Sequence, residues 1–559
     1  MGSALSSWAK IALAASILLL AGAAANNCMA QDTGAPECSS CHDVGQKMQK
    51  HVHASLGCAT CHERHQQYPH PAGIAKPACA TCHENAGAEH AGSVHGQELK
   101  KGNAAAPECV TCHGTAHEVV SAKSVAFRMK IPETCGMCHT DVAIQFQTSV
   151  HGQAVAKGIS QAPVCTDCHG EHSILRHTDA ASSVNSSHIR ETCGSCHGDV
   201  RLARKFGFPP DRLVSFDASF HGLAAKAGSQ TVAHCASCHG VHNILPSSDS
   251  RSTIHVRNLA DTCGRCHPGA GSRFTIGPVH LTGARAEPSA VGWVRQFYLW
   301  LIPITIGLML LHNAGDWARK LYRLRLARNR PRDKGKPAEL RMFGFERVQH
   351  ALLASSFIVL VWSGFALKFP GQWWARPMLH WEGSTAVRSV VHRAAAVIFI
   401  AVSVMHVISL ITNRRLRQHW HELLPARRDV SEAADGFAYN LGLTSSPPAL
   451  SPHSYIEKVE YWALVWGGVV MVLTGVVLWA NGLALVWLPK SAVDVATAIH
   501  LYEAILATLA VLVWHFYFVI FDPEVYPLNT ALVTGYSPGT EDSKPSEASE
   551  IPQETVAKT

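Results

Sequence analysis

The segment Cys38-Ser39-Ser40-Cys41-His42 is the first of nine copies of the pattern Cys-x-x-Cys-His in a chain of 559 residues. Two thiols at this spacing can form thioether bonds to the two vinyl groups of one porphyrin, and the next residue brings an imidazole under the iron. A single copy would suit a zinc site, a redox dithiol or a disulfide equally well, but nine copies predict nine covalently attached c-type haems. The predicted attachment residues are Cys38, Cys41 and His42; Cys58, Cys61 and His62; Cys79, Cys82 and His83; Cys109, Cys112 and His113; Cys135, Cys138 and His139; Cys165, Cys168 and His169; Cys193, Cys196 and His197; Cys235, Cys238 and His239; and Cys263, Cys266 and His267.

These motifs lie within internal repeats. Three units share the order Ser-x-His-Gly, then Cys-x-x-Cys-His-Gly with a nearby His, then Thr-Cys-Gly-x-Cys-His, and they begin at Ser93, Ser149 and Ser219. A looser unit that contains His53 precedes them, and the Cys38–His42 motif stands alone. The arrangement resembles the doubled Cys-x-x-Cys-His family of multihaem cytochromes.

A low-spin electron-transfer haem needs a second axial ligand, and the repeats supply one further His for each site. We expect bis-His ligation throughout, with distal ligands His53, His65, His95, His117, His151, His172, His221, His242 and His280. We expect surface or propionate contacts for His51, His70, His90, His177, His188, His234 and His255. Nine sites between residues 31 and 290 leave little chain for an apolar core, so the haems themselves are expected to form it.

The remaining cysteine, Cys28, lies at the end of an export segment. Lys10 precedes the apolar run Ile11–Ala25, and Ala30 follows it, which predicts a signal peptide at residues 1–30. Lipidation of Cys28 is the alternative. The formal charge of +7 omits the haem propionates, and the basic residues lie beside apolar segments, so no nucleic-acid partner is expected.

The second half predicts a membrane domain of five helices, because each of five apolar stretches is long enough to cross a bilayer. They are residues 294–317, 348–369, 387–412, 459–480 and 493–521. Residues 319–341 carry ten Lys or Arg, so the rule that basic loops face the cytoplasm places the repeats in the periplasm and the C-terminus in the cytoplasm.

The predicted fold is therefore all-α and irregular, with a haem-cored domain and a five-helix bundle in the bacterial inner membrane. The expected divisions are a signal peptide at 1–30, a periplasmic nine-haem domain at 31–290, a tethering helix and basic loop at 291–342, a dihaem membrane domain at 343–530 and a disordered cytoplasmic tail at 531–559.

Histidines within apolar helices are costly and indicate a function. His392 and His406 are 14 residues apart and His500 and His515 are 15 apart, so each pair returns to about the same helix face after four turns. Packing or hydrogen bonding is the alternative role for these side chains.

The segments Arg347-Val348-Gln349-His350, Trp362-Ser363-Gly364 and Arg388-Ser389-Val390-Val391-His392, together with His500 and His515, carry a second resemblance. From Arg347 to about Phe521 the chain resembles the dihaem cytochrome b subunits of formate dehydrogenases and nickel-iron hydrogenases, which are related to bacterial cytochrome b561. The resemblance implies an outer b haem on His392 and His500 and an inner one on His350 and His515. The family spacing on the last helix is usually 14 rather than 15, and His406 is an alternative inner ligand.

The first apolar helix is extra to that family and is expected to tether the repeats. His312 on it is expected to be an interfacial or hydrogen-bonding residue, with a ligand role as the alternative. Glu503 lies one turn after His500. It is a candidate acceptor of a quinol proton, with a solvated interface residue as the alternative.

The combined architecture resembles the inner-membrane quinone-linked cytochromes of metal-respiring bacteria. This implies a quinol:cytochrome c-type oxidoreductase that takes electrons from menaquinol and passes them to periplasmic multihaem cytochromes. Two alternatives stay open: a multihaem oxyanion reductase, and the electron-transfer subunit of a larger dehydrogenase or reductase complex. The chain is expected to act as a homo-oligomer or as a subunit of such a complex.

Overall fold

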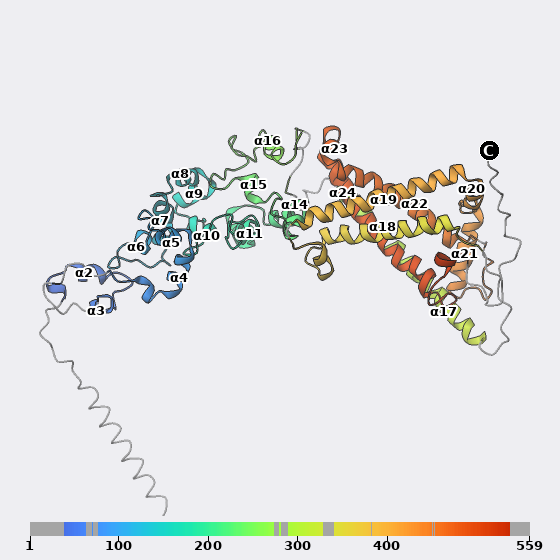
Figure 1. The fold of residues 1–559 in the computed structure, drawn as a ribbon, viewed down its shortest axis with the longest axis horizontal. Coiled ribbons are helices and arrows are strands. Elements are labelled where there is room, and N and C mark those ends of the chain that lie inside the picture. Colours follow the sequence, from blue (N-terminus) through green and yellow to red (C-terminus); the bar gives the residue numbers. More distant parts are fainter. Residues whose placement is uncertain are drawn as a thin grey trace, which may run out of the picture. The chain divides into compact units, whose positions relative to one another are not determined.

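The computed structural model describes residues 38–62, 70, 76–272, 275, 279–280, 289–327, 340–381, 383–449, 451 and 453–536 (Figure 1). These residues form helices and loops, and the β-structure among them is one isolated antiparallel bridge between Leu340 and Tyr536. The expected all-α and irregular fold is confirmed. The predicted signal peptide, Cys28 and His65 lie outside the described residues.

The chain divides into two compact units. The first comprises Met1–Gln147 and His151–Arg176, and the second comprises Thr148–Val150 and His177–Thr559.

The first unit is built from short helices joined by loops. Its elements are η1 (Cys38–Ser40), α2 (Val44–Met48), α3 (Cys58–Cys61), η2 (Cys79–Thr81), α4 (Glu84–Gly92), α5 (Val94–Lys100), α6 (Cys109–His113), α7 (Val125–Gly136), α8 (Thr140–Thr148), α9 (Val150–Ala156) and α10 (Cys165–His169). The second unit continues the repeats with α11 (Ile189–His197), α12 (Val200–Phe206), α13 (Arg212–Ala218), α14 (Phe220–Lys226), α15 (Cys235–His239) and α16 (Leu259–Gly264).

The repeated Ser-x-His-Gly motif forms the N-terminal cap of a helix. Ser93 is the N-cap of α5, and its hydroxyl accepts a hydrogen bond from the N–H of Gly96 at 3.1 Å. Ser219 caps α14 in the same way through Gly222, at 3.2 Å. A Cβ on either glycine would clash with the backbone of the preceding helix. The motif therefore sets a sharp corner between two helices and fixes the His between the Ser and the Gly.

Few apolar side chains are buried in the repeats. Among the described residues from 38 to 280, the buried apolar side chains are Ala162, Val164, Ile189, Ala203, Ala224, Ala227 and Leu245. Alanines dominate this set, so the protein atoms alone supply no core of ordinary size.

Five long helices in the second unit are long and apolar enough to cross a membrane. They are α17 (Ser289–Ala327), α18 (Gly344–Lys368), α19 (Ser384–Thr412), α22 (Tyr455–Trp479) and the helix formed by α24 (Lys490–Ala510) with its π-helical continuations η4 (Val511–His515) and η5 (Tyr517–Phe521). All five predicted crossings are confirmed as helices.

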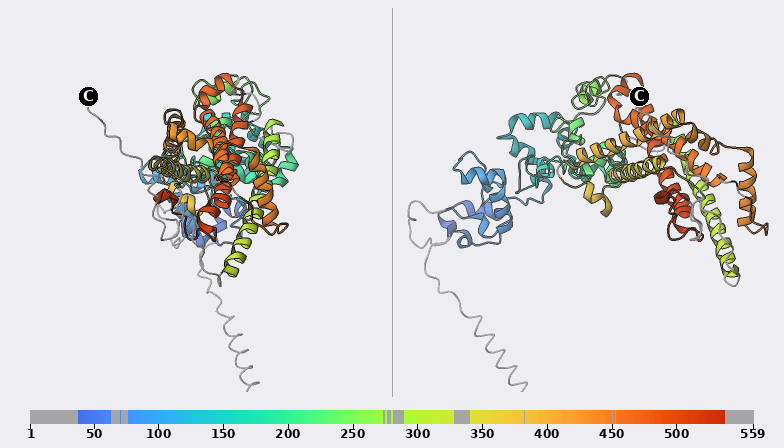
Figure 2. Two further views of the ribbon diagram at one scale, coloured as in Figure 1. Left: turned by 90° about the vertical axis from the view of Figure 1, so that its right-hand side faces the viewer. Right: turned by 45° about the vertical axis from the view of Figure 1, so that its right-hand side comes forward.

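The membrane helices pack in two groups (Figure 2). Helix α18 packs along α19, and α24 packs against both α22 and α17. Shorter elements cover the ends of these helices: η3 (Trp373–Met378), α20 (Arg414–His421), α21 (Arg427–Asn440), α23 (Asn481–Trp487) and α25 (Ala531–Thr534). Residues 531–536, assigned to the tail from their sequence, belong to the folded part, because α25 and the Tyr536 bridge attach them to the start of α18.

Candidate functional site: facing imidazoles in the repeats and the membrane

Among the described residues, at least seven motif histidines, including that of the solitary first motif, face a second histidine ring. The ring centroids lie 6.0–6.2 Å apart in every pair. The pairs are His42 with His70, His53 with His83, His62 with His117, His95 with His139, His113 with His172, His221 with His267, and His239 with His280.

This separation fits one metal atom between two imidazoles. A metal–nitrogen bond to His is about 2 Å long, and a ring nitrogen lies about 1 Å from its ring centre, which places two axial imidazoles about 6 Å apart. Rings at this distance are too far apart for direct contact. The residues present therefore fit a six-coordinate haem iron.

His70 was missed as a ligand candidate. The sequence places it among the surface histidines and favours His65, whereas in the structure the His70 ring faces that of His42, with 9° between the ring planes. The first motif stands outside the repeats, so no repeat position marked His70. His151 and His242, which are also expected ligands, correspond in their own repeats to His95 and His172.

Burial keeps several of these rings neutral. It lowers the pKa values of His95, His113 and His221, and it lowers that of His239 to about 4, with a further contribution from the charge of His280. A neutral imidazole has the free lone pair that a metal ligand needs.

Cysteines of successive motifs lie close together. Thiols interact between Cys79 and Cys109, Cys112 and Cys135, Cys135 and Cys165, Cys193 and Cys235, and Cys238 and Cys263. The described cysteines form no disulfides. Haem attachment sites of successive motifs are therefore adjacent, both within a repeat and between consecutive repeats.

The membrane helices contain one facing pair of the same geometry. His350 on α18 and His515 on η4 have centroids 6.2 Å apart, with 40° between the ring planes. The Nδ1 of His515 hydrogen-bonds Glu460 Oε2 at 3.2 Å, which leaves its Nε2 available.

A π-helical turn accounts for the unusual spacing between His500 and His515. The N–H of Phe516 donates to the carbonyl of Val511, five residues back instead of four. This turn contains one more residue than an α-helical turn. A 15-residue spacing therefore places His500 and His515 on the same helix face, as a 14-residue spacing does in the family that the sequence resembles.

His392 and His500 form the other expected membrane site. They lie close enough to interact electrostatically. Ser363 Oγ is 2.7 Å from His392 Nδ1 and donates its own hydrogen to the Val359 carbonyl at 2.6 Å, so the His must donate to the Ser. In the same way, Thr474 Oγ1 lies 2.9 Å from His500 Nδ1 and donates its hydrogen to the Val470 carbonyl at 2.7 Å. Both rings therefore carry hydrogen on Nδ1 and turn a bare Nε2 to the site.

Further features of this site fit a porphyrin. A Cβ on Gly364 would lie 3.5 Å from the His392 ring, and one on Gly475 would lie 3.4 Å from the His500 ring. Arg388, one turn before His392, is buried, and its Nε has no hydrogen-bond partner among the described residues. Such an arginine suits a haem propionate.

The other membrane histidines have polar partners. His406 Nε2 is 3.0 Å from the Tyr461 hydroxyl, and His312 Nε2 is 2.6 Å from that of Tyr455. The geometry therefore favours His350 over His406 beside His515, and His312 has its expected hydrogen-bonding role.

Glu503 contacts the extra helix. The hydroxyl of Tyr298 on α17 donates to Glu503 Oε2 at 2.8 Å, and Tyr298 stacks on Tyr502 with centroids 5.6 Å apart. A carboxylate held within an apolar bundle by one phenol is a candidate proton acceptor.

Comparison with known proteins agrees with the membrane half of this arrangement. A search of curated proteins gives no match to the chain. Residues 341–531 match the family model of prokaryotic cytochrome b561. The match runs from α18 to the start of α25 and includes His350, His392, His500 and His515. The chain therefore contains a cytochrome b561-like domain, an integral membrane unit that transfers electrons through b haems.

Proposed function

We propose that the chain oxidises menaquinol in the bacterial inner membrane and passes the electrons through two b haems and nine c haems to periplasmic multihaem cytochromes. In this proposal the His392–His500 site lies toward the periplasm and the His350–His515 site toward the cytoplasm, as the basic loops indicate. Bound haem iron supplies the one-electron redox chemistry.

The observation that carries the proposal is a packing contact between the third repeat and the membrane domain. Ala227, directly after α14, is fully buried in a cluster with Ala366, Met378 and Leu379. The N–H of His380 donates to the Ala227 carbonyl at 3.4 Å. Ala366 lies one turn after Ser363, which holds His392, so a short path through protein joins the b site to the repeats.

The residues divide the work of quinol oxidation. Each quinol releases two electrons and two protons. The Glu503 carboxylate, hydrogen-bonded by Tyr298 and one turn from His500, is placed to take the first hydroxyl proton, and the second proton passes to water. The imidazoles of His392 and His500, fixed by Ser363 and Thr474, hold the acceptor iron.

The test uses the purified full-length protein and a water-soluble menaquinol analogue. We expect the b-haem absorbance to change first and the c-haem absorbance to follow. Glu503→Gln should slow quinol-driven reduction at least tenfold without changing reduction by dithionite. Asp494→Asn, which removes a carboxylate paired with Lys490 on the same helix, is the matched control. Haems that stay oxidised with quinol would refute the proposal, and co-purification of a dehydrogenase subunit would favour a role within a larger complex.

A further inference from the structure

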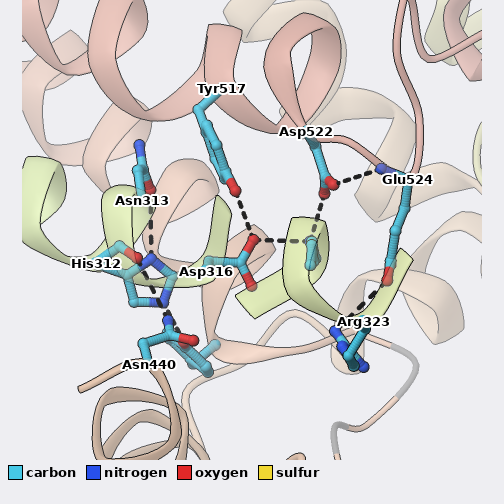
Figure 3. A network of polar contacts seen from close by, with 10 residues as sticks. His312, Asn313, Asp316, Arg323, Asn440, Tyr517, Asp522 and Glu524 are labelled. Carbon is cyan, nitrogen blue, oxygen red and sulfur yellow. Dashed lines mark hydrogen bonds and ion pairs between the residues drawn. The ribbon is translucent and has the colours of Figure 1, made fainter. Parts of the chain in front are cut away.

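Helix α17 lies outside the residues that match cytochrome b561, yet its polar side chains hold the segment that carries His515 (Figure 3). Asn313, Asp316 and Lys320 follow one another at helical spacing along one face of α17. Asn313 and Asp316 contact residues two positions from His515, and Lys320 contacts Asp522, directly after the last membrane helix.

The first contact is made inside the π-helical turn. Asn313 Nδ2 donates to the carbonyl of Val513 at 2.6 Å, two residues before His515. A π turn departs from the regular backbone ladder, and a side chain that hydrogen-bonds within such a turn stabilises the local distortion. The imidazole of His312 adds a ring contact to Trp514, with centroids 4.8 Å apart.

The second contact lies on the other side of His515. The hydroxyl of Tyr517 donates to Asp316 Oδ2 at 2.7 Å. Lys320 Nζ lies 2.8 Å from Asp316 Oδ2 and 2.6 Å from Asp522 Oδ2. The side chains of Lys320, Asp316 and Asp522 are only 12%, 17% and 9% exposed, so the three charges form a largely buried network. Its rupture would leave a buried charge unpaired, which is costly.

These contacts bracket the ligand. Val513 and Tyr517, two residues before and two residues after His515, are both fixed from α17, while Glu460 on α22 holds the imidazole Nδ1. The orientation of the His515 ring toward His350 thus depends on α17, which carries neither of the two ligands.

We propose that Asn313, backed by the Asp316–Lys320–Asp522 network, is a positioning residue for His515 and sets the electronic properties of the haem held by His350 and His515. The extra helix is then more than a tether, since its Asn313–Lys320 face tunes the haem held by His350 and His515. The proposal rests on the b-haem site and not on quinol oxidation.

The experiment compares Asn313→Leu, which has similar volume but no donor, with Asn313→Gln, which keeps one. Redox titration and low-temperature EPR of the full-length protein resolve the two b haems, and His350→Ala identifies the signal of the His350–His515 site. EPR of a bound haem would be sensitive to the angle between the planes of the two histidine rings that hold it, and the His350 and His515 rings are 40° apart. A contact that only stabilises the fold would not change one haem selectively.

We expect Asn313→Leu to change the reduction equilibrium of the His350–His515 haem at least threefold, about 28 mV for one electron, and to alter its EPR signal. The His392–His500 haem should stay unchanged, and Asn313→Gln should restore the wild-type values at least in part. Selective loss of the His350–His515 haem would support the proposal equally. Two unchanged potentials, or equal shifts of both, would overturn it. If Asn313→Leu yields no folded protein, Tyr517→Phe, which removes one hydroxyl from the network, is judged by the same criteria.

Discussion

His350 and His515 face each other with ring centroids 6.2 Å apart, although they lie on the first and last long helices of the cytochrome b561-like domain. His406, the alternative ligand, is hydrogen-bonded to Tyr461 at 3.0 Å. We therefore expect His350→Ala to lower the non-covalent haem content from two per chain to one, while His406→Ala keeps both. A pyridine haemochrome assay counts b against c haem, and haem loss in His406→Ala alone would reverse the assignment.

His70 provides a test in the repeats. Because its ring faces that of His42 at 6.2 Å, we expect His70→Ala to leave the first c haem without its second imidazole and to produce a high-spin signal from one haem. His90→Ala is the control, since His90 hydrogen-bonds the Pro107 carbonyl at 3.2 Å and faces no motif histidine among the described contacts. EPR of the oxidised protein distinguishes the variants, and a fully low-spin His70→Ala protein would exclude His70.

Hydrogen bonds to the ligand rings should tune the His392–His500 haem. A ring that donates from Nδ1 is the stronger electron donor to iron, so Ser363→Ala and Thr474→Val should each raise the midpoint potential. One hydrogen bond is worth about 0.5–1.5 kcal/mol, or about 20–65 mV for one electron. Thr497→Val, on the helix that carries His500, is the control, because its hydroxyl donates to the Val493 carbonyl and not to a ligand ring. A potential that falls or stays constant in the ligand-contact variants would contradict this explanation.

The glycine of the Ser-x-His-Gly motif should be intolerant of a side chain. A methyl group at Gly96 meets the backbone of His90 and Ala91, whereas one at Gly92 meets nothing within 4 Å. We expect Gly96→Ala to lower the free energy of unfolding by about 1–3 kcal/mol and to disturb the His95–His139 pair, and Gly92→Ala to do neither. Guanidinium unfolding followed by haem absorbance measures both effects. Equal stabilities of the two variants would show that the corner adapts.

An ion cluster that joins the second and third repeats predicts a pH-dependent stability. Burial alone would raise the pKa of Asp217, but Arg190 and Lys226, at 2.7 and 3.1 Å, outweigh burial and hold the pKa below its usual value. The ionised Asp217 therefore stabilises the fold fully above the ordinary carboxyl range, and this contribution is lost as pH falls through the lowered pKa. Asp217→Asn should cost roughly 1.5–3 kcal/mol at pH 7, and the difference from the wild type should shrink in acid. Unfolding titrations across that range measure it, and a constant difference would exclude the mechanism.

The composition and local motifs of the chain determined much of this architecture. Nine Cys-x-x-Cys-His motifs predict nine haem attachments because thioether formation needs only residues adjacent in sequence. The five membrane helices follow from hydropathy and length, and Gly364 and His392 carried the family resemblance in short segments.

Only the tertiary structure decided which imidazoles meet. It selected His70 for His42, His172 of the next repeat for His113, and His350 over His406, because each partner comes from a distant segment whose approach depends on packing. The π turn before His515 and its contact with Asn313 were equally invisible in the sequence. A one-residue excess between two histidines does not reveal where the helix widens, since the neighbouring helix that stabilises the widened turn decides its position.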